Sequence, residues 1–184
     1  MSVKEIALAC LISAMPMAGA KAQKVVLTAE SGITGIVKND ALYYGGLNCN
    51  ILSGKNFSDV YVGMNLNANK EVGFTSLIIE NYPWTKNFSS WARGIFSASK
   101  SGQSFTGQFA PLKASTQVGK FDFSVTPSLE ISRDFKAKTT TTGFTPIFQT
   151  TYQANSNDMI FFEAAYSTSS QNGSYMLSLI HTIK

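Results

Sequence analysis

Charged residues are scarce in this chain of 184 residues. Asp, Glu, Lys and Arg together make up 14% of the sequence, whereas ordinary soluble domains have about 25%. The formal net charge is +4, and the basic residues are spread along the chain without a cluster. A nucleic-acid-binding protein concentrates its basic residues in a run or on one face. The composition therefore argues against a nucleic-acid partner, and it leaves few charges to cover the outside of a soluble all-β domain.

Cysteine and histidine are almost absent. After the first 22 residues, Cys49 is the only cysteine, so this part of the chain cannot form an internal disulfide. The sequence places no partners beside the single histidine, His181. A catalytic triad or a histidine-based metal site needs several groups that converge. We therefore expect a protein that is not an enzyme and that holds no cofactor and no metal.

Long apolar runs are missing except at the N-terminus. The run from Ile6 to Met15 has roughly ten residues, whereas a helix needs about 20 to cross a bilayer. Lys4 precedes this run and Ala20-Lys21-Ala22 follows it, and a signal peptidase accepts small residues in this arrangement. We expect residues 1–22 to be a secretory signal peptide and the mature chain to begin near Gln23.

The sequence is rich in two-residue alternation, and the clearest stretch runs from Gln117 to Phe135. Over these nineteen residues, most apolar side chains stand on odd positions and most polar ones on even positions. Successive side chains of a β-strand point to opposite faces, whereas helical spacing would mix the two sets. The stretch therefore predicts one apolar and one polar face. No linker divides residues 23–184, so we expect a single domain there.

The same pattern predicts eight further strands. They cover residues 24–37, 41–52, 57–66, 71–81, 88–99, 143–153, 158–168 and 174–183. We interpret the Gly-, Ser- and Gln-rich segment 100–116 as the longest loop, with a strand extension at 104–109. Closed bacterial barrels have an even number of antiparallel strands, so we split the long alternating stretch at Thr126-Pro127-Ser128. The sequence then predicts an all-β, antiparallel, up-and-down transmembrane barrel of about ten strands, with eight as the alternative.

Loop lengths agree with this arrangement. Outer-membrane barrels have short periplasmic turns and longer outer loops. If the N-terminus is periplasmic, the two longest connections, 100–116 and 136–142, both fall on the outer side. Loop 100–116 is therefore the expected contact with an extracellular surface or ligand. The expected periplasmic turns are short and lie at 53–56, 82–87, 126–128 and 154–157.

The polar face indicates which side of the barrel is enclosed. In the clearest strands it carries small uncharged residues such as Gly63, Asn65 and Ser124, which suit a narrow lumen better than a solvated exterior. Charged residues of both signs share this face. We expect them to form a network that fills the lumen, because an unpaired buried charge is costly. They are Arg93, Lys120, Asp122, Glu130 and Glu163.

The apolar face is then expected to contact lipid. In the long alternating stretch it consists of Phe121, Phe123, Val125, Leu129 and Ile131. All seven tyrosines and Trp84 lie in expected turns or near expected strand ends. Tyrosine and tryptophan rings prefer the boundary between lipid and water, so their placement also favours a membrane barrel.

In these features the mature chain resembles, over its whole length, the small bacterial outer-membrane β-barrel proteins of eight to ten strands. The resemblance is one of pattern and rests on no diagnostic motif. It implies a place in the cell outer membrane, with lipid as a partner. Barrels of this size include acyltransferases, deacylases and proteases, but the histidines that such enzymes carry at the outer rim are missing. Members also usually end on an aromatic residue, whereas this chain ends on Lys184.

Three functions fit this picture. The one we favour is a structural or adhesive scaffold with a packed lumen that presents extracellular loops, because barrels this narrow are usually filled by side chains. The second is a narrow porin-like channel. The third is a soluble, periplasmic, lipocalin-like carrier of an apolar ligand.

Overall fold

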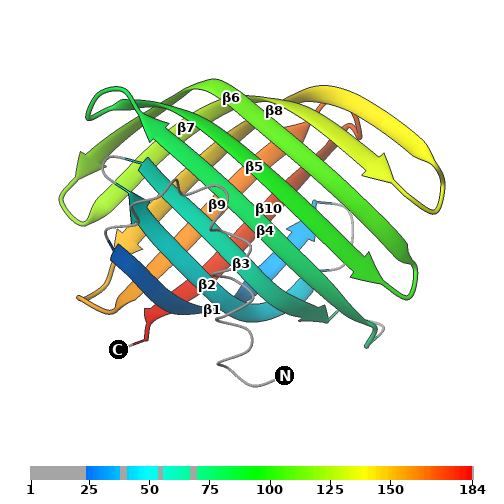
Figure 1. Ribbon diagram of the computed structural model, residues 1–184, viewed down its shortest axis with the longest axis horizontal. Coiled ribbons are helices and arrows are strands. Elements are labelled where there is room, and N and C mark those ends of the chain that lie inside the picture. Colours follow the sequence, from blue (N-terminus) through cyan, green and yellow to red (C-terminus); the bar gives the residue numbers. More distant parts are fainter. Residues whose placement is uncertain (1–23, 38–40, 54–55, 67–69, 184) are drawn as a thin grey trace.

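The computed structural model describes residues 24–37, 41–53, 56–66 and 70–183, which form one closed antiparallel barrel (Figure 1). Each strand pairs with its neighbours in the chain, and β1 pairs with β10 to close the sheet. The predicted ten-stranded, all-β, up-and-down barrel is thus confirmed. The strands are β1 (Lys24–Ile36), β2 (Leu42–Ser53), β3 (Asn56–Leu66), β4 (Val72–Pro83), β5 (Phe88–Ser99), β6 (Gly102–Val118), β7 (Phe121–Asp134), β8 (Thr139–Gln153), β9 (Asp158–Ser167) and β10 (Asn172–Thr182).

The interpretation of residues 100–116 as a loop is wrong, apart from the expected strand extension at 104–109, which is part of a longer strand. Almost all of this segment belongs to β6, which pairs with β5 on one side and β7 on the other. The split at Pro127 is wrong as well, because β7 runs unbroken from Phe121 to Asp134. The two errors cancel in the strand count. The expected total of ten was reached with one strand missing and another cut in two.

A β-bulge at Pro111 explains why β6 escaped detection. The pairing of β6 shifts by one residue between Phe109 and Ala114, and the same strand shifts against β5. A bulge adds one residue to a strand, so the inward-facing positions change from even to odd within β6. Alternation therefore fails when it is counted across the whole segment, although it holds on each side of Pro111.

The prolines of three neighbouring strands lie together in the barrel wall. Pro127 on β7 pairs directly with Pro146 on β8, and the interrupted part of the β6–β7 ladder contains Pro111. Proline has no N–H to donate, so inside a sheet it is confined to places where the ladder is already broken. Pro127 is accommodated within a strand because its neighbour β6 bulges at the same height.

The connections that the structure describes in full are short at both rims. The rim that carries Lys24 and Ile183, here called the terminal rim, has turns at 84–87, 119–120 and 154–157. The opposite rim, here called the far rim, has turns at 100–101, 135–138 and 168–171. Figure 1 shows the hairpins closing tightly at both ends of the tilted strands. The described residues therefore contain no long outer loop, which corrects the expected difference between the two sides.

The outside of the barrel is apolar around its circumference. Large side chains exposed there include Phe109 (52%), Val125 (51%), Leu129 (61%), Phe148 (44%) and Leu179 (51%). Aromatic side chains lie near both ends of this belt. They are Tyr82, Trp84, Phe88 and Phe121 near the terminal rim and Tyr43, Phe135 and Tyr166 near the far rim.

The expected signal peptide, residues 1–22, lies outside the described residues. In the described part of the chain, no helix is long and apolar enough to cross a membrane.

Candidate functional site

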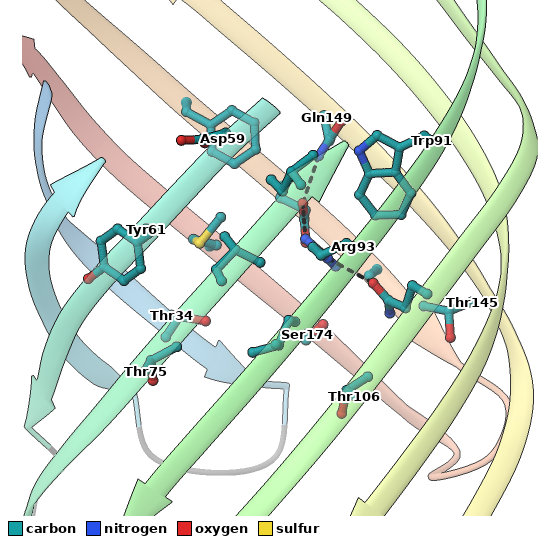
Figure 2. Close-up of a pocket in the computed structure, with 18 of the residues that line it drawn as sticks. Thr34, Asp59, Tyr61, Thr75, Trp91, Arg93, Thr106, Thr145, Gln149 and Ser174 are labelled. Carbon is teal, nitrogen blue, oxygen red and sulfur yellow. Dashed lines mark hydrogen bonds and ion pairs between the residues drawn. The ribbon is translucent and has the colours of Figure 1, made fainter. Parts of the chain in front are cut away.

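The inward faces of all ten strands enclose a cavity of about 1100 Å³. Its lining reaches both ends of the barrel, from Asn81 and Ile180 near the terminal rim to Thr141 and Asn172 near the far rim. Figure 2 shows these walls carrying mostly hydroxyl, amide and charged groups among some apolar ones. This lumen is the candidate functional site.

A buried ion pair crosses the lumen. Nη1 of Arg93 on β5 donates to both carboxylate oxygens of Glu163 on β9, at 2.8 and 2.9 Å. Three strands separate β5 from β9 around the barrel, so the pair joins walls that do not touch through the sheet. Arg93 is 8% exposed and Glu163 is 7% exposed. Charges this well buried require both a partner and further hydrogen bonds.

Two glutamines supply those hydrogen bonds. Nε of Arg93 donates to Oε1 of Gln108 at 2.8 Å, and Nε2 of Gln149 donates to Oε2 of Glu163 at 2.8 Å. The guanidinium of Arg93 also lies 5.1 Å from the centre of the Trp91 ring, which is within the range of a cation–π interaction. Figure 2 shows Arg93 in the same part of the lumen as Trp91 and Gln149, with dashed lines for its bonds.

The network extends to a second carboxylate and a lysine. Nε2 of Gln108 donates to Oε2 of Glu130 at 2.8 Å, and the hydroxyls of Thr145, Ser167 and Ser169 donate to the two oxygens of Glu130. Nζ of Lys113 donates to Oε1 of Gln149 at 3.1 Å. The hydrogen bonds to Glu130 therefore come from neutral donors, whereas Glu163 pairs with the positively charged guanidinium of Arg93.

An apolar cluster packs within the same wall. Trp91, Ala110 and Ile147 are each no more than 2% exposed and contact Ile79 and Ala165. All five stand on inward-facing positions of β4, β5, β6, β8 and β9. The ion-pair network and this cluster together fill the part of the lumen next to β5–β9.

The opposite wall carries a different set of groups. Oε1 of Glu30 on β1 accepts from the Tyr44 hydroxyl at 3.0 Å, and its Oε2 accepts from Nδ2 of Asn48 at 2.6 Å. The Tyr44 hydroxyl also contacts the hydroxyl of Ser178. Asp59 lies on β3, away from the ion pair in Figure 2.

Glycine makes room for tyrosine on this wall. Gly46 and Gly63 pair across β2 and β3, and a methyl group at either position would overlap the Tyr61 ring. An aromatic ring that covers strand glycines restores the packing that these residues lack. Tyr61 meets Tyr44 edge to face, with ring centres 6.2 Å apart.

The placement of two tyrosines differs from the expectation. Tyr44 and Tyr61 point into the lumen, and Tyr61 is only 5% exposed. Tyr61 also lies in the middle of β3 (Asn56–Leu66), whereas the sequence interpretation placed every tyrosine at a membrane boundary. Strand propensity and the adjacent glycines account for its position.

The structure brings together three of the five residues predicted for the lumen network. Arg93 and Glu163 bond directly, and Gln108 links Arg93 to Glu130. Lys120 lies in the turn between β6 and β7, where its Nζ donates to the carbonyl oxygen of Ala154 at 3.3 Å. Asp122 lines the lumen near the terminal rim, outside the bonds that join the other three.

The residues predicted to face lipid stand on the outward side of β7. Phe121 is 43% exposed, Val125 51%, Leu129 61% and Ile131 50%. Phe123 is partly buried, stacks on Phe121 with ring centres 6.0 Å apart, and also borders the lumen cavity.

Several lumen residues were not predicted from the sequence. Lys113 belongs to the part of β6 that was taken as a loop, and Gln108 lies in the expected strand extension but was not assigned to the network. Gln149 was placed on the polar face, but its role as an uncharged link between charged groups was not predicted. The alternation of Thr106 and Gln108 with Phe105 and Phe109 agrees with the expected strand extension at 104–109, and it is the signal that could have placed Gln108 in the lumen. Glu30 was missed because the register of the first strand was unclear from its apolar residues.

The described residues contain no group of three or more His, Cys, Asp or Glu side chains that could hold a metal ion. His181 lies near the terminal rim, where its Nδ1 is 2.6 Å from Oδ1 of Asp158. Both side chains are substantially exposed.

No protein-family model and no curated protein matches this chain. Solved structures that are similar include a de novo designed transmembrane β-barrel, which is 11% identical over 86% of this chain and 95% of its own, with a TM-score of 0.46. The outer membrane protein Omp33 of Acinetobacter baumannii is 8% identical over 89% and 100%, with a TM-score of 0.47. The KdgM porin in complex with disordered oligogalacturonate is 9% identical over 88% and 100%, with a TM-score of 0.42. The likeness is one of fold.

Proposed function

We propose that this protein is a non-enzymatic barrel of the bacterial outer membrane whose lumen is a narrow passage for small polar solutes and ions. One observation carries the proposal. The barrel encloses a cavity of about 1100 Å³ that is lined from rim to rim and contains charged and polar side chains, while its outer face is apolar. A soluble barrel that carries an apolar ligand has the opposite arrangement, with an apolar interior and a polar outer face.

The outer face supports a place in lipid. A transmembrane strand needs about 9–11 residues, and every strand from β1 to β10 has at least 10. The aromatic side chains near the two rims match the girdles that flank the apolar band of such barrels. Lipid is accordingly the proposed partner of the belt that includes Phe109, Leu129 and Leu179.

The short turns weigh against the scaffold that we favoured from the sequence. That hypothesis needed an outer loop at 100–116, and these residues form the barrel wall instead. The exposed apolar belt likewise weighs against the lipocalin-like carrier, because a periplasmic protein would expose these side chains to water. The channel is the alternative that the lumen favours.

Reconstitution into planar bilayers tests the proposal. We expect the purified protein to give small, steady conductance steps in KCl, because the Arg93–Glu163 pair divides an already narrow lumen. The double variant Arg93→Ala/Glu163→Ala removes both charges together, so neither is left unpaired, and it should conduct more than the parent protein. Lys100→Ala at the far rim is the control and should leave the conductance unchanged. Folded, inserted protein that passes no current would contradict the proposal.

A further inference from the structure

The charges that line the lumen are unequal in number and in position. Among the described residues that line it, Glu30, Asp59, Asp122, Glu130 and Glu163 are acidic, whereas only Arg93 and Lys113 are basic. Both basic residues stand on the side of β5 and β6. Arg93 bonds to Glu163, and Lys113 bonds to Gln149.

The wall formed by β1, β2 and β3 is therefore acidic without a basic partner. Glu30 is bound by Tyr44 and Asn48, which are neutral donors. Neither Glu30 nor Asp59 takes part in the ion pairs found among the described residues. Glu30 is close enough to Asp59 and to Tyr61 for its charge to interact with both groups.

Three oxygen atoms on this wall have unused bonding capacity. Oδ1 of Asn48, Oδ1 of Asp59 and the hydroxyl of Tyr61 are buried without a hydrogen-bond partner among the described residues. Asn48 is 3% exposed, Tyr61 is 5% exposed, and the two residues pair directly across β2 and β3. Buried polar atoms normally have a partner in the protein or in what the protein binds. Amide, carboxylate and hydroxyl oxygens are the atoms that replace the hydration shell of a cation.

We propose that Glu30, Asn48, Asp59 and Tyr61, here called the acidic wall, make the lumen selective for small monovalent cations. The inference rests on the proposed passage function and names the class of solute that passes. Carboxylates in a narrow pore attract cations and repel anions. In this proposal the cations pass along this wall and are not held at a fixed site. The ion-pair network on the opposite wall narrows the lumen and directs ions towards the acidic wall.

A bilayer experiment with different KCl concentrations on its two sides tests this inference. The reversal potential of the intact protein should correspond to a K⁺/Cl⁻ permeability ratio above one. Glu30→Gln/Asp59→Asn keeps the shapes of both side chains and removes both acidic groups. We expect the ratio to fall about fivefold, which is the effect of one full charge at ~4 Å in water. Asp59→Asn alone should produce part of the fall and leaves the hydrogen bonds of Glu30 in place.

The matched control is Glu71→Gln/Asp134→Asn, which removes two exposed charges beside the far rim and should change the ratio far less. Circular dichroism verifies that each variant is folded. Conductance with a ratio at or below one overturns the cation preference, and a ratio that both double variants lower equally overturns its assignment to the acidic wall. An absence of conductance in the parent protein overturns the passage itself, and the inference with it.

Discussion

Arg93 is the side chain that links opposite parts of the lumen wall. Its guanidinium bonds to Glu163 and Gln108 and lies over Trp91. A buried pair of this kind contributes little net stability relative to apolar residues. Removing one partner, however, leaves the other charge unpaired in a poorly hydrated site. The consequence should be visible in stability as well as in conductance.

Glu163→Gln is expected to destabilise the folded barrel by about 3 kcal/mol, the lower end of the range for breaking a buried ion pair. The reason is that Arg93 keeps its charge and loses its only direct carboxylate partner among the described residues. Urea unfolding in lipid vesicles, followed by tryptophan fluorescence, measures the effect. Lys86→Gln in the exposed turn 84–87 is the control and should change the free energy of unfolding by less than about 0.5 kcal/mol. Equal losses for the two variants would show that Glu163 is hydrated in the folded state.

The sequence revealed individual lumen residues better than it revealed their partners. The alternation of apolar and polar positions placed Arg93, Glu130 and Glu163 on the inner face, because each lies in a strand whose alternation is clear. It could not pair Arg93 with Glu163, since that contact depends on the tilt and stagger of strands separated by three others around the barrel. Lys120 stands on the even, polar positions of the same alternating stretch as Glu130. It lies in a turn, however, where the pleat of a strand does not fix the direction of its side chain.

The strands differ in how clearly the sequence predicts them. β7 was evident because no residue interrupts its alternation from Phe121 onwards. β6 was hidden because the bulge at Pro111 exchanges its inner and outer positions halfway along. Proline at 127 then suggested a turn, since proline is normally excluded from a central strand. Only the three-dimensional neighbourhood of β6, β7 and β8 shows why this strand tolerates it.

Two matched substitutions on β6 and β7 test what the outer face contacts. Leu129 in the middle of β7 and Val118 at the end of β6 are almost equally exposed, at 61% and 63%. In lipid, Leu129→Arg should cost about 2–4 kcal/mol, whereas Val118→Arg near the rim should cost roughly 0–1 kcal/mol. Unfolding in bilayers of defined composition measures both. Small and equal costs would show that water, and not lipid, surrounds the barrel.

As a whole, the described part of the barrel presents a lumen and an apolar outer wall. Its turns at 100–101, 135–138 and 168–171 are short, so these three connections present few residues to a partner at the far rim. The long-loop scaffold inferred from the sequence depended on residues 100–116, and removing them would delete most of β6 and break the closed sheet. This architecture agrees with the proposed function in the lumen.

The seam between β1 and β10 has a consequence for the connectivity of the chain. Near the terminal rim, the backbone N–H of Ile183 donates to the carbonyl oxygen of Leu27 at 2.9 Å, so the two ends of the described barrel are neighbours. A circular permutant that joins Ile183 to Lys24 through a short linker and opens in the turn 154–157 would keep every strand pair. We expect it to refold in detergent with the circular dichroism and conductance of the parent protein.

A permutant that opens at Pro127 cuts through β7, so it should fail to close. If the first permutant fails as well, the order in which the strands are made matters to this barrel. If it succeeds, the ten strands behave as a ring with no intrinsic beginning, and the place where the chain starts is only a point on that ring.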